Sequence, residues 1–194
     1  MKYTVTALVA ALAAFAEAGT TAEWKTKNIY QVLTDRFARA DGSTSACTNL
    51  SQYCGGNYKG MINHLDYVKG MGFDAIWISP VVTNYPGSYH GYHATNWETY
   101  NSNFGSKQDL IDFVNAAHSK GIWVMVDVVA NHVGPVGTNY SQVYPFNQAS
   151  HYHSTCQISN WNDQNQVENC RLADLPDLDQ SNSYVREYLK NWVH

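Results

Sequence analysis

Strand-like and helix-like patterns of apolar residues alternate along most of the chain. The predicted strands are the β-rich run 28–33 and the continuous apolar runs 75–78 and 122–129. The predicted helices are 58–71, 106–120 and 182–194. Glycines follow the first two helical patterns, at Gly72 and Gly121, where a helix commonly ends.

Each predicted helix has one apolar face with helical spacing. These faces consist of Ile62, Leu65, Val68 and Met71 in the first, Leu110, Ile111, Val114 and Ala117 in the second, and Val185, Tyr188, Leu189, Trp192 and Val193 in the third. Ser106 is placed to cap the second helix. Residues 81–104 are expected to form an aromatic loop, and the polar stretch 130–180 gives no clear helical signal.

Alternating strands and helices predict an α/β fold with parallel strands and right-handed crossovers. A doubly wound sheet and the start of a (β/α)₈ barrel both fit this order. No strand is followed by the phosphate-binding pattern G-x-G-x-x-G, which disfavours a nucleotide-binding sheet. The long polar excursion after the third strand favours a barrel, because barrels carry function on loops after their strands.

The first residues have the layout of a secretory signal peptide. Lys2 precedes an apolar run that ends near Phe15, and Ala16-Glu17-Ala18 forms a small-x-small cleavage site. We therefore expect residues 1–18 to be a signal peptide and the protein to be secreted and extracellular. No other stretch is long and apolar enough to span a bilayer, so no membrane partner is expected.

The four cysteines, Cys47, Cys54, Cys156 and Cys170, fit an oxidising compartment. Of the three possible connectivities, pairing of nearest neighbours is favoured because each pair closes a short loop. Zinc binding fits poorly, since no pair is spaced as C-x-x-C. Asn49 and Asn139 begin sequons for N-glycosylation.

Charge and composition limit the possible partners. The net charge is -4, and no basic stripe exists to neutralise phosphates, so nucleic acid is not expected as a partner. Aromatic residues make up 13% of the chain, almost as much as the 14% that is charged. Aromatic rings can pack on the flat faces of sugars or simply fill the core, and composition alone leaves both possibilities open.

Six segments carry a family resemblance, and they occur in the family's order. They are I-Y-Q-V-L-T-D-R-F at 29–37, C-G-G at 54–56, G-F-D-A-I-W-I-S-P-V at 72–81, Y-H-G-Y at 89–92, D-V-V-A-N-H at 127–132 and L-P-D-L-D at 175–179. Together they resemble the α-amylase superfamily of glycoside hydrolases, and in particular the secreted fungal α-amylases. The resemblance covers residues 24–194.

This resemblance implies the N-terminal part of a TIM (β/α)₈ barrel, namely its first three βα units. Residues 19–132 would begin the catalytic barrel, 133–180 would be an inserted calcium-binding subdomain, and 181–194 would be a truncated third barrel helix. The matching Ca²⁺ ligands are the side chains of Asn131 and Asp177 and the backbone carbonyl of Glu168, all oxygen donors. The plainer alternatives are a solvated loop carboxylate for Asp177 and a turn-capping amide for Asn131.

The resemblance also implies substrate-binding residues. His132 would hydrogen-bond the sugar at the cleavage site, Tyr92 would stack beneath that sugar, His90 would line the same pocket, and Gln52 would contact sugar further along the cleft. Two features depart from the family. His93 stands where tryptophan is common, and the loop between Pro80 and Tyr89 is shorter than in fungal relatives.

Retaining glycoside hydrolysis needs a nucleophilic carboxylate and an acid/base carboxyl. Asp35 and Asp127 end strands that face the site, but neither matches a catalytic position, and Asp127 is interpreted as a structural carboxylate. The catalytic pair is expected beyond residue 194, so the chain alone is expected to be inactive. The implied function is endo-hydrolysis of α-1,4 bonds in starch or glycogen, by a monomer when full length. The alternatives are an α-glucosidase or transglycosylase of the same superfamily, or a non-catalytic glucan-binding fragment.

Overall fold

The computed structural model describes residues 19–193, so the predicted signal peptide lies outside the described residues. Its centre is a three-stranded parallel sheet with the order β1 (Ile29–Gln31), β2 (Ala75–Ile78) and β5 (Trp123–Val126). The order of the strands in the sheet is the order of the predicted strands along the chain. Parallel neighbours need a crossover connection between them, which is usually a helix. The predicted α/β fold with parallel strands is therefore confirmed.

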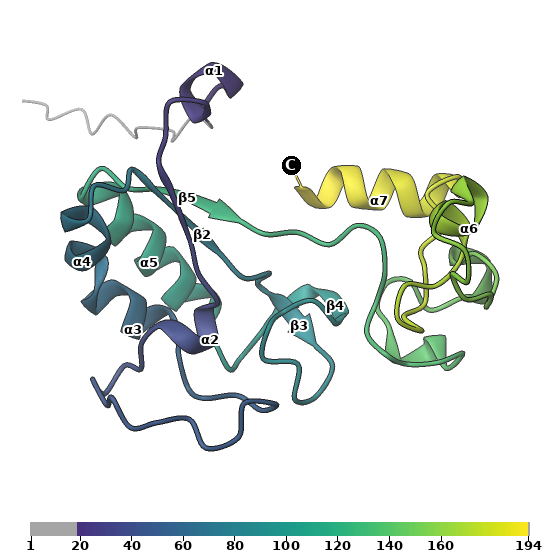
Figure 1. Ribbon diagram of the computed structural model, residues 1–194, viewed down its shortest axis with the longest axis horizontal. Helices are drawn as coiled ribbons and strands as arrows, with labels where there is room; N and C mark the ends of the chain where they lie inside the picture. Colours follow the sequence, from purple (N-terminus) through teal and green to yellow (C-terminus); the bar gives the residue numbers. More distant parts are fainter. Residues whose placement is uncertain (1–18, 194) are drawn as a thin grey trace, which may run out of the picture.

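Helices α3 (Tyr58–Asn63), α4 (Leu65–Gly70) and α5 (Lys107–Ser119) lie together along the sheet (Figure 1). They share a first buried core with the strands. Its members are Tyr58, Met61, Leu65, Val68, Ile76, Ile78, Phe104, Phe113, Ala117 and Ile122. A shorter helix, α1 (Thr21–Trp24), precedes the sheet, and its Trp24 ring packs edge-on against Trp123 at 5.0 Å.

The prediction of one continuous helix over 58–71 is wrong. The chain leaves helical geometry at His64, with φ −120° and ψ 13°, and α4 begins at the next residue. This break changes which side chains face the sheet: Met61 is fully buried, whereas Ile62 only packs at the edge of the core. Met71, predicted on the apolar face, is 43% exposed.

Helix α5 begins as its sequence predicts. The Ser106 hydroxyl accepts from the Asp109 amide (3.1 Å), and the Asp109 carboxylate accepts from the Ser106 amide (2.8 Å). This reciprocal cap satisfies two backbone donors at the helix start. The buried face is centred on Phe113 and Ala117. Ile111, predicted on that face, is 40% exposed instead.

The third predicted strand, 122–129, is shorter and less buried than its apolar sequence suggests. Only Trp123–Val126 pairs with a neighbour, and Val126 and Val128 are 38% and 47% exposed. Within residues 19–193, β5 is an edge strand and pairs with β2 alone. Val126 and Val128 line a cavity of about 580 Å³, together with Trp192.

The remaining elements lie in segments that the sequence pattern left without regular structure. The aromatic loop holds an antiparallel pair, β3 (Val82–Asn84) and β4 (Ala94–Tyr100). The polar stretch holds the 3₁₀ turns η1 (Tyr140–Gln142) and η2 (Ala149–His151) and the helix α6 (Gln164–Asn169). Short polar helices such as α6 have too few apolar positions for a periodic signal.

A second buried core joins the β3–β4 hairpin, the polar stretch and the last helix, α7 (Ser183–Val193). Its members are Val82, Ala94, Trp97, Val133, Val136, Val143, Phe146, Tyr152, Leu178, Val185 and Leu189. In Figure 1, α6 and α7 lie at the opposite end of the view from α3, α4 and α5, and β3 and β4 lie between them. Val185 and Leu189 on α7 are buried as predicted, whereas Val193 is 58% exposed.

The cysteines pair as nearest neighbours in the sequence, as predicted. Cys47 joins Cys54 with a Cα separation of 5.6 Å, and Cys156 joins Cys170 with 4.9 Å. Both separations lie in the normal range for disulfides. The first bridge closes the loop that follows β1, and the second ties the end of α6 back to the preceding loop.

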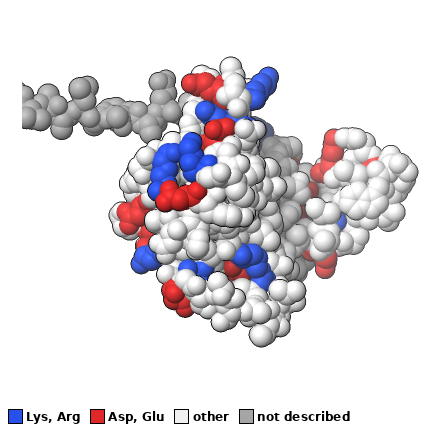
Figure 2. Space-filling view, turned by 60° about the vertical axis from the view of Figure 1, so that its left-hand side comes forward, with Lys and Arg blue, Asp and Glu red and all other residues white. Residues whose placement is uncertain are grey.

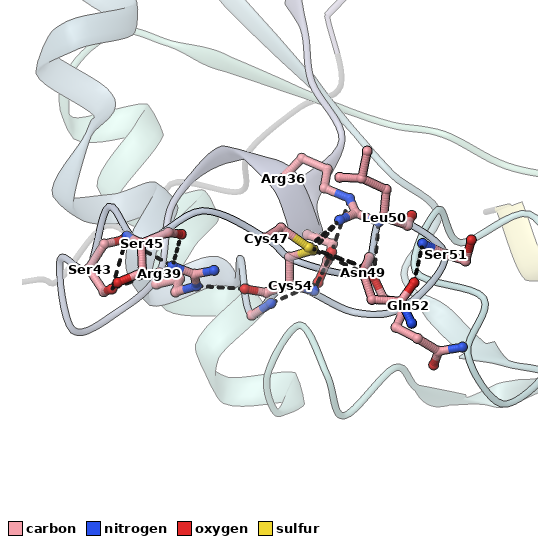
Figure 3. The surroundings of a disulfide bond; sticks show 12 residues. Arg36, Arg39, Ser43, Ser45, Cys47, Asn49, Leu50, Ser51, Gln52 and Cys54 are labelled. Carbon is pink, nitrogen blue, oxygen red and sulfur yellow. Dashed lines mark hydrogen bonds and ion pairs between the residues drawn. A yellow bond between two sulfur atoms is a disulfide. The ribbon is translucent and has the colours of Figure 1, made fainter.

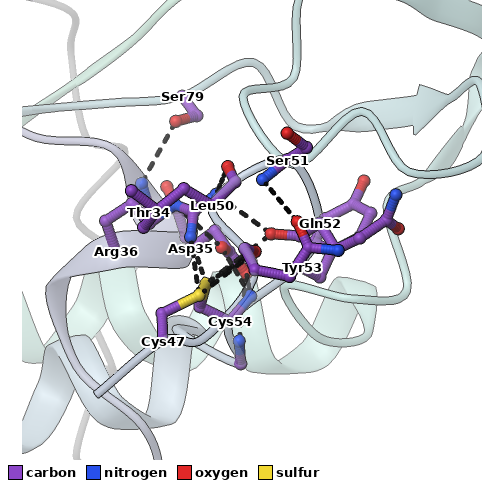
Figure 4. A network of polar contacts seen from close by, with 12 residues as sticks. Thr34, Asp35, Arg36, Cys47, Leu50, Ser51, Gln52, Tyr53, Cys54 and Ser79 are labelled. Carbon is purple, nitrogen blue, oxygen red and sulfur yellow. Dashed lines mark hydrogen bonds and ion pairs between the residues drawn. A yellow bond between two sulfur atoms is a disulfide. The ribbon is translucent and has the colours of Figure 1, made fainter.

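The first disulfide loop is fastened to the end of β1 through α2 (Thr34–Phe37) (Figures 3 and 4). The buried Asp35 carboxylate accepts from the amides of Cys54 (2.8 Å) and Gly55 (3.1 Å). Arg36 donates to the carbonyls of Leu50 (2.7 Å) and Gln52 (3.0 Å). Asp35 and Arg36 thus hold this loop to α2 and act as structural side chains.

Charged side chains of both signs are scattered over a largely uncharged surface in Figure 2. Between residues 19 and 193, no helix is long and apolar enough to cross a membrane.

We predict that non-reducing peptide mapping of the purified protein will recover Cys47 linked to Cys54 and Cys156 linked to Cys170. The reason is geometric, because each pair already has Cα atoms close enough for a disulfide without backbone movement. Recovery of a peptide that joins Cys47 to Cys156 would contradict both the pairing and the packing of the two loops. A sample alkylated before digestion controls for disulfide exchange.

Candidate functional site

A cavity of about 190 Å³ lies where β1, β2 and β5 end. Its lining residues are Gln31, Val32, Leu33, Trp77, Ile78, Ser79, Tyr92 and Asp127. The Tyr92 hydroxyl donates to Asp127 Oδ2 at 2.7 Å. Burial, the bond to Asp127 and its negative charge together raise the pKa of Tyr92 to about 12. Asp127 thus holds the Tyr92 ring from the end of a neighbouring strand, in line with the structural role predicted for this carboxylate.

Tyr92 in turn fixes His90. The two rings stack with centroids 5.7 Å apart and planes 15° apart, and the Tyr92 amide donates to His90 Nδ1 at 3.0 Å. A backbone amide can only donate, so Nδ1 is unprotonated and the neutral ring carries its proton on Nε2. Burial, with a smaller effect of His132, lowers the pKa of His90. His90 is therefore a neutral ring with a free N–H donor.

His132 has the opposite arrangement. Its Nδ1 lies 3.3 Å from the carbonyl oxygen of Val133, and a carbonyl can only accept, so the neutral ring carries its proton on Nδ1 and leaves Nε2 as an acceptor. Burial lowers the pKa of His132, opposed by the Val133 carbonyl and by Asp177. His90 and His132 are thus two neutral imidazoles near each other, with one hydrogen-bond donor at His90 Nε2 and one acceptor at His132 Nε2. A hydroxyl group can both donate and accept a hydrogen bond, so it can use both.

The ring of His93 supports His90 from the side. The two ring centroids are 4.5 Å apart with perpendicular planes, and His93 Nδ1 lies 2.8 Å from the hydroxyl oxygen of the buried Ser88. The His93 amide donates to Asn84 Oδ1 at 2.7 Å. The ring of His93 therefore turns toward its own loop and braces the segment that carries His90.

Gln52 lies beside the same segment without reaching the histidines. Its side-chain amide is next to Gly87, where an added Cβ would stand 3.4 Å from it. Its carbonyl accepts from Arg36, whose guanidinium covers the Tyr89 ring at 3.8 Å. In the described part of the chain, Gln52 has no hydrogen bond to His90, Tyr92 or His132.

Asn131 and Asp177 are brought together from segments far apart in the sequence. Asn131 Nδ2 donates to Asp177 Oδ1 at 3.1 Å. Backbone bonds hold the two segments together: Leu178 N donates to Asn131 O (2.8 Å) and Val133 N to Pro176 O (3.0 Å). Asp177 is only 4% exposed, and burial raises the pKa of its carboxyl, opposed by the smaller effects of His153, His132 and Asn131.

This pair fits a hard cation such as Ca²⁺. A buried carboxylate has lost its water, and a cation would compensate the buried charge. An amide rotated by half a turn presents its oxygen where its nitrogen now lies, so Asn131 can offer the neutral oxygen donor that Ca²⁺ accepts. Between residues 19 and 193, no cluster of three or more His, Cys, Asp or Glu side chains could hold a metal, so such a site needs Asn131 and backbone oxygens.

The third predicted ligand, Glu168, lies in the last turn of α6 with its side chain exposed and paired with Gln164. The Arg171 amide, which follows this turn, donates to the Cys156 carbonyl at 2.8 Å and not to a carbonyl of α6. In the described residues, no hydrogen bond joins Glu168 to Asn131 or Asp177.

Comparison with known proteins identifies the family. The family described as alpha amylase, catalytic domain, matches residues 31–194. The chain belongs to the alpha-amylase family. It is 46% identical to alpha-amylase 1 of Schwanniomyces occidentalis over 88% of this chain and 36% of that protein. The structure of an alpha-amylase from Malbranchea cinnamomea matches with a TM-score of 0.86 and 43% identity, over 90% of this chain and 40% of that one.

An alpha-amylase from Geobacillus thermoleovorans, complexed with acarbose, matches with a TM-score of 0.78 and 37% identity, over 87% of this chain and 37% of that one. The chain thus spans little more than a third of the length of these alpha-amylases. The resemblance drawn from the six sequence segments is confirmed.

Within the alpha-amylase framework, the structure groups His90, Tyr92 and His132, and it pairs Asn131 with Asp177. Within residues 19–193, no hydrogen bond links Gln52 or Glu168 to these groups. Sequence reasoning missed the contacts that hold the site. Ser88, which pins His93, and His153, which contacts Asp177, lie in irregular loops where no periodic pattern marks a residue. A polar residue buried in a loop can be found only from the packing around it.

We predict that His93 contributes to acid sensitivity. Burial, followed by the effects of His90 and His132, lowers the pKa of His93 to about 4. Folding disfavours the protonated ring of His93. Its contribution to the free energy of unfolding is therefore complete above the unfolded pKa of about 6.5 and is lost as the pH falls toward 4. Urea unfolding measured across this window should show a smaller loss of stability for His93→Asn than for the unchanged chain.

The control is His118→Asn, which removes a histidine from an exposed position on α5 and should leave the slope unchanged. Equal pH slopes for His93→Asn and the unchanged chain would show that His93 is readily protonated in the folded state.

Proposed function

We propose that this chain is the first part of a secreted α-amylase that cleaves α-1,4-glucosidic bonds inside starch or glycogen with retention of configuration. The observation that supports this most is the grouping of His90, Tyr92 and His132 beside the cavity at the strand ends, within an alpha-amylase family chain. Ring stacking and paired hydroxyl contacts are what a glucose unit offers to a protein. The matched alpha-amylase that holds acarbose supports an oligosaccharide ligand.

We propose the domain organisation that the resemblance implies. Residues 19–132 would form the first barrel units, 133–180 the inserted subdomain and 181–194 part of the third barrel helix. The two buried cores support a division into two parts. The second core also includes the β3–β4 hairpin and α7, so the inserted subdomain would be attached through a shared apolar interface and not by a flexible hinge.

In this proposal the residues of the chain bind and orient the sugar. Tyr92, held by Asp127, supplies a stacking face. His90 donates a hydrogen bond from Nε2, and His132 accepts one at Nε2. The nucleophile and the acid/base, which retaining hydrolysis needs about 5–5.5 Å apart, would come from the remainder of the protein. Asp35 does not serve, because its carboxylate is buried and bonded to the amides of Cys54 and Gly55.

A calcium ion would be held by the side chains of Asn131 and Asp177 and by the carbonyl of Glu168. Bound there, it would supply structural rigidity by cross-linking the end of β5 to the inserted subdomain. His132 follows Asn131 directly, so the same cross-link would fix the sugar-binding histidine. Secretion would also expose the sequons to glycosylation, and both Asn49 and Asn139 lie on the surface.

An assay for the hydrolysis of starch tests the proposed activity. We predict that the purified 194-residue chain releases no reducing sugar from starch, because both proposed catalytic carboxylates would lie outside it. The full-length product of the gene should hydrolyse starch, and Tyr92→Ala in that product should lower kcat/KM on the order of a hundredfold, a typical effect of removing one contact to the reacting group.

Two results would contradict this proposal. Starch hydrolysis by the 194-residue chain, prepared free of host amylase and compared with a heat-inactivated sample, would place catalytic groups within it. A full-length product that binds malto-oligosaccharides without cleaving them would favour the glucan-binding alternative. Chromatography of the products separates hydrolysis from transglycosylation, since only the latter yields oligosaccharides longer than the substrate.

The calcium proposal has its own test. We predict that Asp177→Asn lowers the Ca²⁺ affinity of the chain at least tenfold, because it removes the one ionised side chain among the proposed ligands. Calorimetry on chelator-treated protein measures this. Asp174→Asn is the matched control, since the Asp174 side chain is 76% exposed and pairs with Arg171. Equal affinities for Asp177→Asn and the control would contradict the proposed site.

A further inference from the structure

The ring of His153 lies between two carboxylates of the L-P-D-L-D segment. Its Nδ1 is 2.7 Å from Asp177 Oδ2, and its Nε2 is 3.2 Å from Asp179 Oδ1. The His153 side chain is only 18% exposed. None of the six segments that carry the family resemblance includes this residue, and it lies more than twenty positions from both partners.

The backbone around His153 is fixed to the same segment. Its amide donates to the Asp177 carbonyl (3.0 Å), and the Asp179 amide donates to the carbonyl of His151 (2.9 Å). Between these bonds Tyr152 and Leu178 form an antiparallel bridge, and both side chains are buried in the second core. The ring is therefore presented to the two carboxylates by a short ladder that cannot shift without opening that core.

The two oxygens of Asp177 have different partners as a result. Oδ2 faces His153, while Oδ1 accepts from Asn131 at 3.1 Å. A carboxylate held at one oxygen by a fixed ring cannot rotate freely about its last bond. Oδ1 is thus the oxygen kept on the side of Asn131, where the proposed ion would lie.

Asp179 holds the far side of the ring. Its Oδ1 accepts from the amide of Ser181 (2.8 Å) and from the Ser181 hydroxyl (2.5 Å), besides facing His153 Nε2. With three contacts on one oxygen, Asp179 is anchored just before α7 begins. A continuous chain of polar contacts then runs from Ser181 through Asp179, His153 and Asp177 to Asn131.

We propose that His153 is the positioning residue of the calcium site, setting Asp177 so that Oδ1 faces Asn131. This inference rests on the proposed calcium site and adds to it a residue that touches no ion. Groups that orient metal ligands commonly contribute ten- to a hundredfold to metal affinity. His153 achieves this by occupying the second oxygen of Asp177, with Asp179 as its support.

Calorimetric titration of CaCl₂ into the chelator-treated full-length product of the gene tests the proposal. We expect His153→Ala to weaken Ca²⁺ binding by about ten- to a hundredfold. His153→Gln keeps one amide donor within reach of Asp177 and should recover part of that loss. Asp179→Asn leaves the ring in place but weakens its support, so its effect should be smaller than that of His153→Ala.

His151→Ala is the matched control for general destabilisation. His151 lies in the same ladder, but its ring stacks on Tyr184 at 4.9 Å and faces neither carboxylate. We expect this variant to lower the unfolding temperature measured with chelator while leaving the Ca²⁺ dissociation constant unchanged. Circular dichroism confirms that each variant retains its secondary structure.

The outcomes separate the two hypotheses. If the unsubstituted full-length protein binds no Ca²⁺, the proposed calcium site is wrong, and the role of His153 falls with it. If the unsubstituted protein binds Ca²⁺ and its His153→Ala variant binds it equally well, the site stands and the positioning role is wrong. Equal weakening by His153→Ala and His151→Ala would also overturn the proposal, since it would show an effect of stability alone.

Discussion

Residues 131–133 pair through their backbone with residues 176–178, and the rest of the candidate site depends on this contact. The bonds from Leu178 N to Asn131 O and from Val133 N to Pro176 O close a long excursion onto the end of β5. Without them, Asn131 and Asp177 would belong to unrelated loops. Closure of such a loop has an entropic cost, which the buried side chains of Val133 and Leu178 offset within the second core.

The acidic side chains near the strand ends are used to hold other groups. Asp35 binds the amides of the first disulfide loop, and Asp127 binds the Tyr92 hydroxyl. Asp177 is shared between Asn131 and His153. A carboxylate with such partners is oriented and cannot act freely as a nucleophile or proton donor. In the described part of the chain, Asp35, Asp127 and Asp177 therefore hold neighbouring groups in place.

The sequence predicted the parallel sheet, the disulfide pairing and the start of α5 because each depends on local or nearly local signals. The apolar run of β2, the cap at Ser106 and the short separations between cysteines are of this kind. It failed where burial depends on the surroundings. The spacing of apolar residues placed Met71 and Ile111 on buried faces, yet both are exposed, because burial is set by the elements that pack against each helix.

The sequence also failed to predict the state of single side chains in the candidate site. The motifs led to His90 and His132, but not to their protonation, which follows from one backbone amide and one carbonyl. They marked His93 only as a departure from the tryptophan that is common at this position. The structure shows its ring bonded to Ser88 and packed against His90, so its polar edge is already used within the loop. The His93 imidazole thus holds the neighbouring ring of His90 in place. The residue type alone could not have shown whether His93 contacts a ligand or supports His90.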